Sequence, residues 1–167
     1  GELHLKSAES NPKMFGFPVE GFIGTTDQKK GLEDNWIDCF LNLRIIPQLL
    51  ILKPTTLDKE IINKVKEKIK TELLHHEPIN ALVHGDLWSG NVGTEKNGKG
   101  VIFDPASWWA DNEVDIAMTK LFGGFKKEFY DEYHRIFPIK KGFEKRIVIY
   151  NFYHILNHAN MLSLIHI

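Results

Sequence analysis

Residues 84–91 read His-Gly-Asp-Leu-Trp-Ser-Gly-Asn, and residues 101–105 read Val-Ile-Phe-Asp-Pro. Four residues separate Asp86 from Asn91, which is the spacing of the catalytic base and a metal-binding amide in the catalytic loop of protein kinases. Asp104 ends a short apolar run, where such enzymes place a second, acidic metal ligand. The two stretches therefore predict a phosphotransferase site.

Each of these side chains suits one chemical role. A carboxylate must orient the attacking hydroxyl and take its proton, and we assign Asp86 to this role. Mg²⁺ prefers oxygen ligands, which Asn91 and Asp104 supply. Between them lies Asn97-Gly98, the strongest short-range signal for a β-hairpin, so paired strands should bring the two ligands together. Alone, each residue is more often a turn former than a ligand, and it is their combination that favours catalysis.

The same stretches resemble the fructosamine kinase (ketosamine 3-kinase) family. Residues 121–125 and Leu156-Asn157-His158 are also similar to that family, as is the segment from Gly31 to Trp36, so the likeness runs from about residue 15 to residue 161. The resemblance implies a two-lobed fold like that of the aminoglycoside phosphotransferases. It also implies phosphorylation of the 3-hydroxyl of ketosamines, free or on glycated proteins, with ATP and Mg²⁺ as cofactors.

Four further residues are candidates for supporting the site. His84 is expected to hydrogen-bond the loop backbone, because this metal prefers oxygen ligands. By the resemblance, Asp115 at the start of the next helix braces the loop, whose amides would supply the donors that a buried carboxylate needs. Trp88 is expected to stack on the substrate's sugar. One of Trp108 and Trp109 should be a core residue and the other should border the substrate; the sequence does not say which, and we take Trp108 as the substrate contact.

The rest of the sequence predicts an α+β, mostly helical domain, the C-terminal catalytic lobe of a protein-kinase-like fold with a small hairpin carrying the metal ligands. Helical spacing of apolar residues marks residues 33–52, 57–73 (capped by Thr56), 126–137 and 143–161. No glycine-rich loop followed by a strand lysine precedes residue 84, so we expect the nucleotide lobe to be absent. We expect a single domain of residues 1–167, in which residues 1–14 are a truncated linker helix, 15–161 the family-like lobe and 162–167 an atypical tail.

Composition narrows the function classes. The 167 residues, 43% apolar and 26% charged, suffice for one globular domain. A net charge of −1 gives no reason to expect nucleic acid or an anionic membrane as a partner. Cys39 is the only cysteine, and no apolar run has the length of a membrane span, so a cytoplasmic location fits best.

Two other functions remain open. One is a different small-molecule kinase of the same fold, acting on aminoglycosides or choline. The residues Leu87 to Gly90 argue against it, and a substrate panel would decide. The other is a noncatalytic lobe that binds sugar amines, since a chain without a nucleotide lobe is expected to be inactive alone. The intact trio of Asp86, Asn91 and Asp104 argues against a decayed site.

Overall fold

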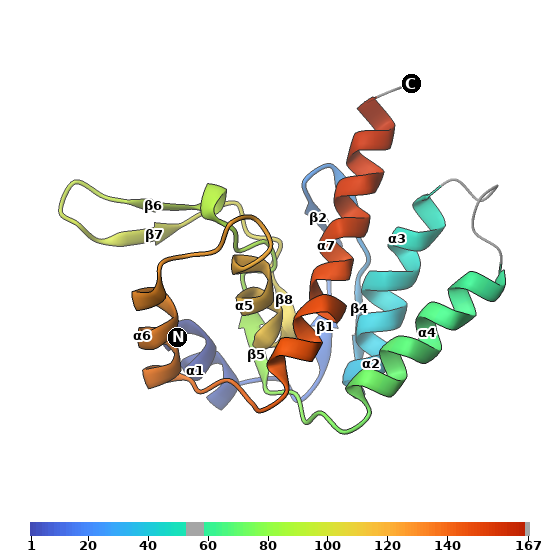
Figure 1. The fold of residues 1–167 in the computed structure, drawn as a ribbon, viewed down its shortest axis with the longest axis horizontal. Coiled ribbons are helices and arrows are strands. Elements are labelled where there is room, and N and C mark those ends of the chain that lie inside the picture. Colours follow the sequence, from blue (N-terminus) through green and yellow to red (C-terminus); the bar gives the residue numbers. More distant parts are fainter. Residues whose placement is uncertain (53–58, 166–167) are drawn as a thin grey trace.

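The computed structural model describes residues 1–52 and 59–165 and has an α+β architecture (Figure 1). About half of the described residues are helical, somewhat less than the mostly helical lobe predicted. The predicted cap at Thr56 lies outside the described residues. Within the described part of the chain, no helix combines the length and apolar character that crossing a membrane requires.

A four-stranded antiparallel sheet, in the order β4-β1-β8-β5, forms the centre of the fold. Its strands are β1 (Phe15–Phe17), β4 (Gly31–Glu33), β5 (Asn80–Val83) and β8 (Trp108–Asp111). Val83 at the end of β5 pairs with Trp108 at the start of β8. The 84–91 loop follows Val83 directly, and the segment containing Asp104 leads into the sheet at Trp108. The pairing of Val83 with Trp108 therefore holds both segments at the same end of the β5–β8 pair.

Two separate hairpins flank the site. The strands β6 (Val92–Thr94) and β7 (Gly100–Ile102) pair antiparallel, with Val92 opposite Ile102, which confirms the hairpin predicted from Asn97-Gly98. Gly98 has φ +85°, the left-handed conformation that favours glycine in such turns. The second hairpin, β2 (Gly21–Ile23) and β3 (Thr26–Gln28), lies beside the upper half of the last helix (Figure 1).

The helical run predicted at residues 33–52 begins later, at Trp36, because Glu33 belongs to β4, and it consists of three parts: α2 (Trp36–Cys39), the π-helical η1 (Phe40–Ile45) and α3 (Ile46–Ile51). Pro47 explains the change of pitch, because it has no N–H to donate to the carbonyl of Leu43 and its ring crowds that carbonyl. The freed carbonyl of Leu43 instead accepts a hydrogen bond from Arg44 Nη1 at 2.8 Å.

The last helix, α7 (Phe143–Ile165), packs against α3, α5 and α4 and is therefore apolar on more than one side (Figure 1). Five other helical segments complete the described part of the fold. They are α1 (Glu2–Glu9), α4 (Lys59–Leu73), the 3₁₀ turn η2 (Ser89–Asn91), α5 (Glu113–Thr119) and α6 (Lys127–Ile136). An aromatic cluster fills the core between α2, β8 and α7. Trp36 stacks on Trp108 and on Phe40, with ring centroids 5.6 and 5.4 Å apart, and Tyr150 lies edge-on to Trp36.

Candidate active site

Two glycines determine the path of the 84–91 loop. Gly85 has φ +84°, and a Cβ at this position would lie 2.1 Å from the carbonyl oxygen of Ala106. A Cβ on Gly90 would lie 2.3 Å from the ring of Trp88. At Gly85 no other residue fits without displacing the backbone, whereas at Gly90 a side chain would require the ring of Trp88 to move. The amide of Ala106 also donates to the carbonyl of His84 at 2.9 Å, which ties the loop to the segment after Asp104.

The three side chains predicted to carry the chemistry line one cavity. Asp86, Asn91 and Asp104 share a hollow of about 450 Å³ with Trp88 and other residues. This volume lies within the range of small-molecule sites, roughly 300–1,000 Å³. The chain therefore brings together residues that are up to 18 positions apart, through the β6–β7 hairpin between them.

Asp86 orients the side chain of Asn91 through two hydrogen bonds. Asn91 Nδ2 donates to the backbone carbonyl of Asp86 at 2.9 Å and to Asp86 Oδ2 at 3.1 Å. These bonds fix the carboxamide, whose oxygen has no hydrogen-bond partner among the described residues. The backbone carbonyl of Asn91 accepts the amide of Phe103 at 3.1 Å, so the peptide next to Asp104 is tied directly to Asn91.

The two acidic residues are in unusual environments. Burial raises the pKa of Asp86, and the hydrogen bond from Asn91 and the nearby His84 and His158 only partly oppose this rise. A raised pKa improves the match of a general base to neutral pH. Asp104 has φ +54°, which is uncommon for a residue with a side chain. Backbone strain of this kind clusters at ligand and metal sites.

His84 has the structural geometry expected of it. Its Nε2 donates to the carbonyl of Phe103 at 2.9 Å, and its Nδ1 accepts the amide of Asp86 at 3.3 Å. In this pattern Nε2 is the donor and Nδ1 the acceptor. The ring therefore links the base residue to the strand end that carries Asp104, and both of its nitrogens are engaged.

Asp115 on α5 accepts hydrogen bonds from the loop. Its carboxylate takes the amide of His84 at 2.7 Å and the amide of Gly85 at 2.8 Å, and it is almost fully buried. Burial alone would raise the pKa of Asp115. The hydrogen bond and charge of His4, together with the two amides, outweigh burial and lower the pKa. A buried carboxylate at the start of α5 therefore anchors the 84–91 loop by its backbone.

The brace extends to residues that the sequence analysis missed. His4 on α1 contacts Asp115 through Nε2 at 3.0 Å, and its Nδ1 bonds the hydroxyl of Tyr133 on α6 at 2.7 Å. Asn112 also donates to that hydroxyl at 3.0 Å. A single histidine in a short helix shows no periodicity that would relate it to a residue more than a hundred positions away.

The two tryptophans predicted to contact substrate lie in different places. Trp88 is 37% exposed and lines the cavity, with its ring edge-on to Phe122. Trp108 is fully buried, stacked on Trp36, with the guanidinium of Arg44 4.0 Å from its ring. A ligand in the cavity cannot reach Trp108 in this structure, so we assign it to the core. Trp108, which we took as the substrate contact, is instead the core residue, because it lies at the start of β8 on the face that packs against α2.

A second acidic cluster could be mistaken for a metal site. His76, Asp111 and Glu113 place ligand atoms within 4.8 Å of one another. Arg146, however, donates to both carboxylate oxygens of Glu113 at 2.6 and 2.7 Å. Asp111 Oδ2 accepts a hydrogen bond from the hydroxyl of Tyr150 at 2.5 Å and lies 2.6 Å from His76 Nε2. The guanidinium already supplies the positive charge, so this is a buried ion-pair network that joins β8, α5 and α7.

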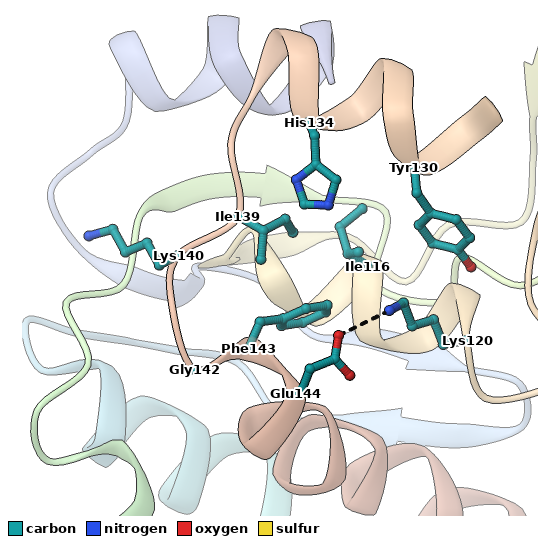
Figure 2. A pocket seen from close by; sticks show the side chains of 9 residues that line it. All are labelled: Ile116, Lys120, Tyr130, His134, Ile139, Lys140, Gly142, Phe143 and Glu144. Atoms are coloured by element: carbon teal, nitrogen blue, oxygen red, sulfur yellow. Dashed lines mark hydrogen bonds and ion pairs between the residues drawn. The ribbon is translucent and has the colours of Figure 1, made fainter. Parts of the chain in front are cut away.

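A different hollow, of about 260 Å³, lies between α5, α6 and α7 (Figure 2). Apolar side chains such as Ile116 and Phe143 form its wall, and Lys120 and Glu144 make an ion pair at 3.4 Å on its rim. None of the predicted site residues lines it. Asp115 and Ile116 are adjacent on α5, so this helix contacts the 84–91 loop on one side and lines this hollow on another.

The fold, the loop spacing and the shared cavity are of the kind found in phosphotransferases of the kinase-like class. The chain belongs to the fructosamine kinase family, whose family model matches residues 1–166. It is 43% identical to a probable ketoamine kinase of Vibrio cholerae over 151 residues, covering 90% of this chain and 52% of the relative. It is 38% identical to a ketosamine-3-kinase of Mus musculus over 150 residues, covering 88% of this chain and 48% of the relative.

A solved structure agrees with these relatives. A crystal structure assigned as a fructosamine-3-kinase from Haemophilus somnus superposes with a TM-score of 0.84 at 30% identity, covering 92% of this chain and 52% of that chain. The chain thus spans about half the length of the curated relatives it matches.

Proposed function

We propose that this chain carries the catalytic base and metal ligands of an ATP-dependent kinase that phosphorylates the 3-hydroxyl of ketosamines, as free small molecules or on glycated proteins. The observation that carries the proposal is that Asp86, Asn91, Asp104 and Trp88 line a single cavity in a member of the fructosamine kinase family. The mouse relative is named a ketosamine-3-kinase, and an Arabidopsis thaliana relative is named a protein-ribulosamine 3-kinase. A cytoplasmic location stays a prediction.

The residues present fit a magnesium ion. Asp104 offers a carboxylate, and the side-chain oxygen of Asn91 has no hydrogen-bond partner in the described part of the chain while its nitrogen is fixed on Asp86. Hard oxygen ligands of this kind are those that Mg²⁺ prefers. Asn91 and Asp104 would hold the ion, and the bound ion would neutralise charge on the phosphates.

The chain's own residues would act on the acceptor. Asp86 lines the cavity, where it would orient the substrate hydroxyl and accept its proton at a carboxylate oxygen. Asn91 holds that carboxylate in place, and His84 and Asp115 hold the loop backbone. Trp88 offers a half-exposed ring on which the sugar can stack. Most of the catalytic effect would therefore come from positioning.

A substrate panel tests the proposal. A preparation of the protein that binds Mg·ATP is incubated with Mg·ATP and fructosyl-lysine, kanamycin or choline, and the products are identified by ³¹P and ¹³C NMR. We expect phosphorylation of fructosyl-lysine at its 3-hydroxyl, with turnover of the other acceptors at least about tenfold lower, because a site built for one acceptor leaves polar groups unpaired with others. Phosphorylation confined to kanamycin or choline would replace the proposed substrate class, and fructosyl-lysine binding without transfer would favour a noncatalytic lobe.

A further inference from the structure

We propose that Phe22, with Asp27 beside it, recognises the protonated amine of the substrate and so distinguishes a sugar carried on an amine from a free sugar. The inference rests on the proposed function and assigns one wall of the same cavity. No motif in the sequence marked either residue, and both belong to the β2–β3 hairpin, which comes about 60 residues before the catalytic loop.

Phe22 and Asp27 lie on the outer face of this hairpin. Side chains alternate along a strand, and Ile23 and Thr26 are buried while Phe22 and Asp27 are exposed. Phe22 pairs directly with Asp27 in the antiparallel register. Opposite residues of such a pair have Cβ atoms roughly 5 Å apart on the same face. An aromatic ring and a carboxylate therefore stand next to each other.

Phe22 is an exposed side chain that does not pack into the hydrophobic core. Its side chain is 64% exposed, yet it lines the cavity that contains Asp86, Trp88 and Asp104. A ligand seated in this cavity would remove the apolar surface of the ring from water, which is favourable. The hairpin itself is anchored on its other face, where Gln28 donates to the carbonyl of Ala106 at 3.3 Å. The hairpin that carries Phe22 is thus anchored at the edge of the cavity.

The cavity suits a cation. Its described lining residues include two carboxylates, Asp86 and Asp104, and two aromatic rings, Phe22 and Trp88, but no lysine, arginine or histidine. An ammonium within about 6 Å of an aromatic ring is attracted by the ring's electron-rich face. A ketosamine carries a protonated amine close to its 3-hydroxyl, whereas fructose carries a hydroxyl in the same place. Phe22 can therefore bind the amine while the sugar hydroxyl reaches Asp86.

Calorimetry with a matched pair of sugars tests this assignment. The chain is titrated with 1-amino-1-deoxyfructose and with fructose, and the ratio of the two affinities is measured. We expect the chain to prefer the amino sugar and Phe22→Ala to reduce that preference about five- to tenfold. Phe22→Tyr should retain the preference, and Asp27→Asn should reduce it about twofold to threefold. The control is Leu32→Ala, which shortens a 40% exposed side chain on β4 outside the cavity lining, and should change neither affinity.

Three outcomes would overturn the inference, and they can be told apart. An equal loss of affinity for both sugars in Phe22→Ala would make Phe22 a general wall of the cavity, and an unchanged preference would mean that it does not contact the amine. Failure of the unaltered chain to bind either sugar would contradict the proposed function as well. Thermal melts identify any variant that fails to fold, and Phe22→Tyr and Asp27→Asn then decide the question.

Discussion

Replacement of Asp86 by Asn is expected to lower ketosamine phosphorylation by about 10²- to 10⁴-fold, the usual contribution of a positioned general base. The fold should survive, because an asparagine oxygen can still accept the hydrogen bond that Asn91 donates to Asp86 Oδ2. The measurement is steady-state turnover, in any preparation of the protein that phosphorylates a ketosamine. The KM for ATP should change little, since the altered group faces the acceptor hydroxyl.

The pH profile of turnover gives an independent check on Asp86. Burial raises its pKa above the usual value of about 3.9. The base acts in its ionised form, so turnover should fall as the pH drops through this raised value, and the acid limb of the profile should lie above the pH of an ordinary aspartate. Asp131→Asn, on an exposed turn of α6, is the matched control and should leave the profile unchanged. Normal turnover in Asp86→Asn would contradict the assignment.

Replacement of Asp115 by Ala is expected to reduce the free energy of unfolding by about 3–5 kcal/mol, the usual cost of breaking a buried charged network. The change leaves the amides of His84 and Gly85 and the ring of His4 without their acceptor in the core. For a domain of this size the melting temperature should fall by about 10 °C. Differential scanning calorimetry measures this, with Asp131→Asn again as the control.

The pKa of Asp115 fixes the pH range over which its contribution acts. The carboxyl has a lower pKa in the folded chain than in the unfolded chain. Its stabilising contribution is therefore complete above the ordinary aspartate pKa of about 3.9 and is lost as the pH falls through the folded value. The difference in stability between the unaltered chain and Asp115→Asn should narrow below about pH 4. A melting temperature lowered by less than about 2 °C in Asp115→Ala would show that the brace is not needed.

Features encoded over short distances could be predicted from the sequence. The β6–β7 hairpin follows from Asn97-Gly98, since the left-handed turn conformation is a local property of these residues. The spacing of Asp86 and Asn91 likewise sets their contact within one loop. The spacing of apolar residues predicted the helical run near residues 33–52, but it does not reveal the π-helical segment Phe40–Ile45 within it.

Features that depend on tertiary contacts could not be predicted in this way. Trp108 and Trp109 are neighbours with the same chemistry, and only the packing of β8 against α2 decides which is buried. His4 joins the brace because α1 lies near α5 and α6, and Phe22 reaches the cavity because a separate hairpin lies over it. In each case the partner is far away in sequence and no local pattern records the contact.

We propose that the side-chain oxygens of Asn91 and Asp104 converge on one divalent cation beside Asp86. Titration of the isotopically labelled chain with Mn²⁺, followed by amide NMR, tests this most directly because the ion broadens signals of nearby groups. We predict selective broadening at residues 86–91 and 103–105, reversed by excess Mg²⁺. Broadening centred on His76, Asp111 and Glu113, or at only one of the two predicted segments, would contradict the claim.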